Sequence, residues 1–294
     1  MHITTVGVSQ RARKLSKGRK LVMLLASILI MIVSLLSMDA STPAQAATTG
    51  VIFQTTFNTD AIGLYTIAEM KLDFHAPWED GVTEGLVSVV NNPAGGTGKV
   101  LKVHYPVGRT SYGVIIPVPL NAQYDALYLS YDVYFPSDFD FVKEGKLHGL
   151  CGGACNSGGA KPNGTDGWSS RVIWRSNGTA NQYLYDPRQV GTYGDIFPWN
   201  NQQFSRGAWH HVQTYVKMNT PGQHDGISES WLDGSLAYHN NQILFRTVPT
   251  LHIDTFKFET FFGGSSSDFA PPKNEYAYFD SIQVSTAPTT TLAH

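Results

Sequence analysis

The segment "WHHVQTYVKM", residues 209–218, alternates between two kinds of side chain. Val212, Thr214 and Val216 fall on one face of an extended chain, because successive side chains of a β-strand point to opposite sides. The other face carries aromatic and hydrogen-bonding groups, namely Trp209, His211, Gln213, Tyr215 and Lys217. The pattern predicts a strand with one face packed in a core and the other lining a groove.

Similar runs rich in Val, Ile, Tyr, Phe and Thr recur at 113–120, 126–135, 169–175, 181–186, 228–234 and 255–264. Turn dipeptides lie near them, Asn-Gly at 163–164 and 177–178 and Asp-Gly at 225–226 and 233–234. No amphipathic helical window exceeds about two turns, and no strand–helix–strand rhythm is present. We therefore predict an all-β protein, a sandwich or a jelly roll.

The first 46 residues have the features of a signal peptide. Basic residues between Arg11 and Lys20 precede an apolar run from Leu21 to Met38, and Ala44-Gln45-Ala46 is a small-residue cleavage site. A retained membrane anchor is the alternative. We expect a secreted protein with no membrane attachment after cleavage, a single β domain over 47–285, and a disordered tail over 286–294.

The charge of the chain argues against nucleic-acid binding. The leader contains six of the 21 basic residues and one of the 23 acidic ones, so the remaining chain has 15 against 22, a net charge of −7. An anionic ligand would need a local cluster of cations to overcome this background.

Cys151 and Cys155, in "CGGAC", are the two cysteines of the chain. In an exported protein this spacing suggests a small disulfide-closed loop. Two cysteines without a nearby histidine pair do not make a zinc site, and the motif is not the redox C-x-x-C. We expect no required metal or other cofactor, and structural calcium stays open although no calcium-loop motif occurs.

Three segments each place a polar pair on one strand face if they alternate regularly. The pairs are Lys146 with His148, Ser169 with Arg171, and Tyr183 with Tyr185. If these strands are neighbours, cations and phenols share one patch, which suits a sugar that bears a carboxylate. The glycines in "EGKLHGLCGG" (144–153) would then let a polymer approach the sheet.

This patch favours elimination over hydrolysis. Glycoside hydrolysis needs a pair of carboxyl groups, and no closely spaced acidic strand motif is present. Elimination instead needs a cation to neutralise a uronate carboxylate, a base to take the C5 proton and an acid to protonate O4. Tyrosine can be such a base when nearby positive charge lowers its pKa.

In chain order, "GKLHGLCGG" (145–153), "DGWSSRVIWR" (166–175) and "YLYD" (183–186) resemble the alginate and glucuronan lyases of polysaccharide lyase family 14. The resemblance covers about residues 130–285 and extends to the related fungal glucuronan lyases. It implies a β-jelly roll of two antiparallel sheets with a concave substrate groove. By position it implies active-site roles for Lys146, Ser169, Arg171, Tyr183 and Tyr185. His148 stands where the family usually has proline.

Each of these residues also has a structural alternative. Lys146 could be a solvated charge, Arg171 could pair with a buried acid such as Asp166, and either tyrosine could only stack on a sugar. We take Lys146, Arg171, Tyr183 and Tyr185 as catalytic. Substrate binding is assigned to Ser169, His148, His211, Gln213 and Tyr215, and structural histidines are the alternative for that group.

We predict a monomeric, secreted lyase that cleaves a β-1,4-linked polyuronate, either glucuronan or alginate of the polymannuronate type, by β-elimination. The partner is an acidic polysaccharide. A non-catalytic carbohydrate-binding sandwich is the main alternative, and a glycoside hydrolase is disfavoured by the missing acid pair.

Overall fold

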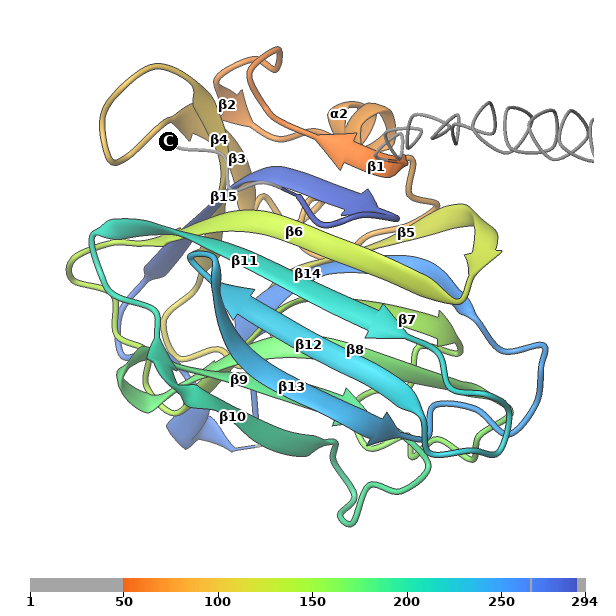
Figure 1. Ribbon diagram of the computed structural model, residues 1–294. Coiled ribbons are helices and arrows are strands. Elements are labelled where there is room, and N and C mark those ends of the chain that lie inside the picture. Colours follow the sequence, from red (N-terminus) through yellow and green to blue (C-terminus); the bar gives the residue numbers. More distant parts are fainter. Residues whose placement is uncertain (1–49, 265, 290–294) are drawn as a thin grey trace, which may run out of the picture. The chain divides into compact units, whose positions relative to one another are not determined.

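The computed structural model describes residues 50–264 and 266–289, which form a sandwich of two antiparallel sheets (Figure 1). The larger sheet has nine strands in the order β13-β12-β11-β6-β15-β4-β3-β2, with β1 also paired to β15. The smaller sheet has six strands in the order β10-β9-β8-β7-β14-β5. The predicted all-β sandwich is confirmed.

The nine-stranded sheet consists of β1 (Val51–Thr55), β2 (Gly63–Leu64), β3 (Val87–Asn91), β4 (Lys99–Tyr105), β6 (Ala126–Phe135), β11 (Ala208–Lys217), β12 (Gly226–Leu232), β13 (Ser235–Ile243) and β15 (Glu275–Ser285). The six-stranded sheet consists of β5 (Gly113–Tyr124), β7 (Glu144–Gly153), β8 (Gly167–Arg175), β9 (Thr179–Tyr185), β10 (Asp195–Gln203) and β14 (Ile253–Phe262). Every run predicted from the sequence overlaps a strand, and 126–135 coincides with β6.

The helices are short: α2 (Ile67–Asp73) and the 3₁₀ turns η1 (Ser176–Gly178) and η2 (Ser267–Phe269). Thr66 and Glu69 form a reciprocal capping box at the start of α2. Within the described ranges, no helix is long and apolar enough to cross a membrane.

The core lies between the two sheets and is rich in aromatic rings. The buried Trp174 of β8 packs edge-on against Phe135 and Phe262, with ring centroids 5.6 and 5.4 Å apart. Gly145 of β7 leaves room for this indole, because a Cβ at residue 145 would lie 1.8 Å from a ring carbon of Trp174. The first glycine of "GKLHGLCGG" therefore makes space for a core side chain and not for a polymer.

The three-residue segment Ser176–Gly178 joins β8 to β9 and sets which residues of these strands face each other. Asn177 and Gly178 both have left-handed backbone angles, φ 62° and 80°, a conformation that asparagine and glycine adopt more readily than other residues. In the resulting register Ser169 lies opposite Tyr185 and Arg171 opposite Tyr183. The Asn-Gly dipeptide thus aligns two of the three predicted polar pairs.

A β-bulge interrupts the alternation of β7. Lys146 is paired with Ile173 and Gly149 with Arg171, so three steps along β7 match two steps along β8. The extra residue places both Leu147 and His148 in the core, where each is fully buried. The prediction that His148 shares a face with Lys146 and binds substrate is therefore wrong, because it assumed an unbroken period of two.

His148 is a neutral core residue in this structure. Its ring stacks on Phe258 at 4.0 Å and lies 4.4 Å from the ring of Tyr131. Nδ1 donates to the main-chain carbonyl of Glu259 at 3.0 Å, which requires the proton on Nδ1. Burial lowers the pKa of His148 to about 3.

The chain after β15 continues along the nine-stranded sheet. The amide of Thr286 donates to the carbonyl of Gly50, and the amide of Thr289 donates to Oε1 of Gln213. The first four residues of the predicted tail are therefore held against the fold. Residues 290–294 and the predicted signal peptide lie outside the described residues.

We expect Gly145→Ala to lower the free energy of unfolding by about 1–3 kcal/mol, because the added methyl group overpacks the Trp174 site. Gly191→Ala is the matched control, since the atom nearest to its Cβ, the carbonyl oxygen of Tyr193, would be 3.7 Å away. Chemical denaturation of both variants gives the comparison. Equal stability of the two variants would contradict this account of β7 packing.

We also expect the stability of the protein to depend on pH, because the buried ring of His148 is neutral. Because its folded pKa, about 3, lies below the unfolded value near 6.5, the unfolded chain binds more protons between these values. The stabilising contribution of the neutral ring is complete above about pH 6.5 and is lost as the pH falls toward 3. Denaturation at several pH values should show a steeper loss for the wild type than for His148→Asn. Parallel curves would show that His148 is not held neutral.

Candidate active site

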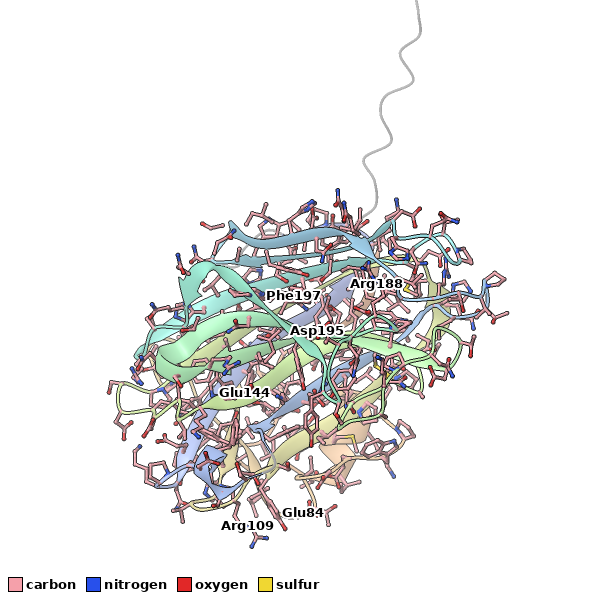
Figure 2. The ribbon with its side chains drawn as sticks, turned by 90° about the horizontal axis from the view of Figure 1, so that it is seen from below. Glu84, Arg109, Glu144, Arg188, Asp195 and Phe197 are labelled. Atoms are coloured by element: carbon pink, nitrogen blue, oxygen red, sulfur yellow. A yellow bond between two sulfur atoms is a disulfide. The ribbon has the colours of Figure 1, made fainter. Side chains whose placement is uncertain are left out.

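The candidate site is a pocket of about 490 Å³ on the face of the six-stranded sheet that points away from the core. Its floor is built from β7, β8, β9 and β14, which are adjacent in the sheet. Figure 2 looks at the molecule from below and labels Glu144 of β7, and Asp195 and Phe197 of β10. Residues of the connecting segments, including Tyr193 and Phe269, complete the walls.

The four residues predicted to be catalytic meet in this pocket. Nζ of Lys146 lies 4.3 Å from the ring centre of Tyr183, and the guanidinium carbon of Arg171 lies 5.0 and 5.3 Å from the rings of Tyr183 and Tyr185. The two phenol oxygens are 3.3 Å apart. All four residues are at least nine-tenths buried. The predicted convergence of cations and phenols is therefore present.

Two buried carboxylates, which the sequence analysis missed, accompany these cations. Glu144 forms an ion pair with Lys146. Glu259 of β14 accepts a hydrogen bond from Nη1 of Arg171 at 2.5 Å through Oε1, and its Oε2 lies 2.8 Å from Nζ of Lys257. The predicted alternative that Arg171 pairs with a buried acid is thus met, but the acid is Glu259 and not Asp166.

The charges lining the pocket nearly cancel. Lys146, Arg171 and Lys257 supply three positive charges, and Glu144 and Glu259 supply two negative ones. Among the described lining residues the formal sum is therefore +1. Such a pocket can accept one carboxylate of a ligand without leaving excess charge in a poorly solvated site.

Burial and ion pairing set the protonation states. Burial alone would raise the pKa of the Glu259 carboxyl, but the attraction of Arg171 and Lys257 outweighs it and holds the pKa at about 2. Burial lowers the pKa of Lys146, and Glu144 opposes this shift. Burial, followed by the hydrogen bond with Tyr185, raises the pKa of Tyr183, so this phenol keeps its proton.

A disulfide-closed loop covers one side of the site. Cys151 and Cys155 are bonded, with Cα atoms 5.1 Å apart, as the cysteine spacing suggested. The loop that follows places the carbonyl of Asn156 2.7 Å from the Ser169 hydroxyl, which donates to it. It also places the amide of Gly159 3.3 Å from the Tyr185 oxygen, which accepts the bond. Ser169, predicted to bind substrate, is fully buried and holds this loop.

The remaining predicted subsite residues lie on the other sheet. His211, Gln213 and Tyr215 belong to β11 in the middle of the nine-stranded sheet, on its face away from the core. Nδ1 of His211 pairs with Asp132 at 2.7 Å, and Tyr215 stacks on Tyr128 with centroids 4.5 Å apart. Their assignment to the groove is wrong. Alternation separates the two faces of a strand correctly but does not say to which sheet the strand belongs.

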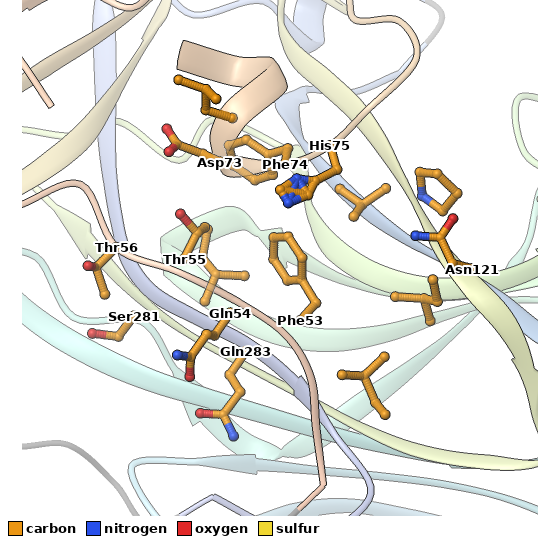
Figure 3. Close-up of a pocket in the computed structure, with 16 residues that line it drawn as sticks. Phe53, Gln54, Thr55, Thr56, Asp73, Phe74, His75, Asn121, Ser281 and Gln283 are labelled. Atoms are coloured by element: carbon orange, nitrogen blue, oxygen red, sulfur yellow. The ribbon is translucent and has the colours of Figure 1, made fainter. Parts of the chain in front are cut away.

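A second cavity, of about 570 Å³, lies between β1, the end of α2, β5 and β15 (Figure 3). Phe53 and Phe74 line it together with Gln54, Asp73 and His75. Among the residues that the structure describes, its lining includes neither lysine nor arginine, which are the cations that would bind a uronate carboxylate. In the described part of the chain, no group of three or more His, Cys, Asp or Glu side chains is arranged to hold a metal ion.

Comparison with known proteins gives consistent matches. Solved structures with the same fold include alginate lyase Aly36B, at 25% identity over 82% of this chain and 98% of that one with a TM-score of 0.70. A variant of that lyase, 23% identical to this chain, is bound to an alginate trisaccharide. The alginate lyase of Aplysia kurodai is 26% identical over 81% of this chain and 99% of its own, with a TM-score of 0.70.

One curated relative is exolysin of Paramecium bursaria Chlorella virus 1, which is 25% identical over 237 residues. This match covers 70% of the present chain but only 36% of exolysin, so the chain spans about a third of that relative. The family model named polysaccharide lyase 14 matches residues 93–282, which include every strand of the candidate site. The chain therefore belongs to polysaccharide lyase family 14.

Proposed function

We propose that this protein is a lyase that cleaves a β-1,4-linked polyuronate by β-elimination. The observation that carries the proposal is the meeting of Lys146, Arg171, Tyr183 and Tyr185 in one pocket of net positive charge. Family membership and the alginate oligosaccharide bound by a protein of the same fold support this class of substrate.

The reaction needs three operations on one uronate. Cations neutralise the carboxylate at C6, which makes the proton on C5 acidic. A base removes that proton, the electron pair forms the C4–C5 double bond, and the bond from C4 to the glycosidic oxygen breaks. An acid gives a proton to the departing oxygen. The fragment toward the original reducing end then begins with an unsaturated sugar at its non-reducing end. The other fragment keeps the glycosidic oxygen as the hydroxyl group of its new reducing end.

The arrangement of donors suggests how the two tyrosines divide the proton transfers. We assign the base to Tyr185, because the Gly159 amide donates to its oxygen, and a donated hydrogen bond favours negative charge on a phenol oxygen. The Arg171 guanidinium lies at similar distances from both rings and does not distinguish them. We assign the acid to Tyr183, whose raised pKa keeps it protonated.

The cations of the pocket bind the C6 carboxylate of the substrate in this proposal. Lys146 and Arg171 lie beside the phenols and, with Lys257, exceed the two fixed carboxylates by one charge. A uronate restores neutrality at this position, whereas a neutral sugar does not. Because side chains supply the positive charge, we propose that the reaction needs no cofactor. Polyglucuronate and polymannuronate both offer the required β-1,4-linked uronate.

We also propose that the protein acts outside the cell as a monomer. The Cys151–Cys155 disulfide suits an oxidising compartment, and the leader features of residues 1–46 suit export.

The wild-type protein should release products with the ultraviolet absorbance of a conjugated carboxylate from polyglucuronate or polymannuronate. We expect Tyr185→Phe to lower kcat by about 10²–10⁴-fold, since it removes the proton acceptor. Lys146→Ala should lower kcat/KM by about 10²–10³-fold, since it removes a charge that stabilises the intermediate. Tyr215→Phe, on the outer face of the other sheet, is the matched control and should keep full activity.

A folded wild-type protein that gives no signal on any polyuronate from neutral to alkaline pH would contradict the proposal. If that protein still bound the polymer, the binding-module alternative would hold. New reducing ends without the ultraviolet signal would indicate hydrolysis.

A further inference from the structure

Glu259 lies at the centre of the pocket's ion pairs but has no part in the proton transfers. We propose that Glu259 is the positioning residue that sets Arg171 and Lys257 for the substrate carboxylate, and that His148 fixes Glu259 from the core. This inference rests on the proposed function and adds a residue chain, His148–Glu259–Arg171, that reaches from the interior of the sandwich to the pocket.

Arg171 can cross β7 to reach Glu259 because the residue between them, Gly149, has no side chain. Arg171 of β8, Gly149 of β7 and Lys257 of β14 are paired in one row across three strands. A Cβ on Gly149 would lie 2.6 Å from Cγ of Arg171. With no side chain at Gly149, and with Leu147 and His148 directed into the core, Arg171 extends across β7 and reaches Glu259.

Glu259 holds both cations at once. One carboxylate oxygen accepts from Arg171, and the other faces Lys257. Arg171 is 3% exposed, and its Nε has no hydrogen-bond partner within the described residues, so Glu259 is the acid that fixes its guanidinium. Without the negative charge, two cations would repel each other in a poorly solvated row.

His148 holds the main chain of Glu259 from the opposite side of the sheet. Its Nδ1–H donates to the Glu259 carbonyl at 3.0 Å, and its ring is packed against Phe258 and Tyr131. The β7 bulge brings this ring behind β14. A shift of His148 would move the Glu259 backbone and, through the carboxylate, the guanidinium.

A positioning role predicts a separation between kcat and KM. Glu259→Gln keeps the size of the side chain but removes its charge, so Arg171 and Lys257 lose their fixed geometry and the pocket gains one positive charge. We expect kcat on polyuronate to fall about 10- to 100-fold, because small misplacements of catalytic groups cost this much. KM should not rise, and its dependence on salt should steepen because the pocket attracts the polyanion more strongly.

His148 gives a second test that leaves every pocket side chain in place. His148→Asn can keep a donor near the position of Nδ1, whereas His148→Leu cannot. We expect His148→Leu to lower kcat several-fold more than His148→Asn, with similar KM values for both. Thermal denaturation of each variant identifies losses of activity that come from unfolding. If Glu259→Gln does not fold, the comparison of His148→Leu with His148→Asn tests the inference alone.

The inference is overturned if folded Glu259→Gln keeps kcat within twofold of an active wild type, or if its KM rises with unchanged salt dependence. Equal kcat values for His148→Leu and His148→Asn would show that His148 does not position Glu259. These outcomes differ from failure of the proposed function, in which the wild type itself shows no lyase activity.

Discussion

The geometry of the candidate active site depends on one buried carboxylate, that of Glu259, which lies between two cations. Glu259 is fully buried, contacts Arg171 and Lys257, and leaves the pocket with a single excess positive charge. A buried ion pair gives little stability by itself, but removing one partner leaves an uncompensated charge, which is strongly unfavourable. The arrangement is therefore better explained by function than by folding: it keeps cations in a dry site, ready for a uronate.

The backbone features around this carboxylate give it access to its partners. The β7 bulge turns two consecutive side chains inward, and Gly149 clears the path that Arg171 takes to Glu259. The Asn177-Gly178 turn sets the register that puts Arg171 opposite Tyr183. His148, which the bulge turns into the core, donates a hydrogen bond to the Glu259 carbonyl.

Much of this could be predicted from the sequence because the signals are local. Period-two alternation put Ser169 with Arg171 and Tyr183 with Tyr185, and the family resemblance implied that these pairs share one site. His148 was misplaced because a bulge leaves no clear mark in side-chain alternation. His211, Gln213 and Tyr215 were misplaced because alternation does not identify the sheet. Glu259 was missed because it reaches Arg171 from 88 residues away, a pairing that only the sheet order creates.

The most direct test of this account is a crystal structure of the Lys146→Ala variant with a bound uronate tetrasaccharide. We predict one sugar carboxylate in hydrogen-bond contact with Arg171 or Lys257, both still held by Glu259, and C5 of that sugar about 3–3.5 Å from the Tyr185 oxygen. An oligosaccharide bound in this pocket with its carboxylates turned away from both cations would contradict the account, as would one bound only on the outer face of the nine-stranded sheet.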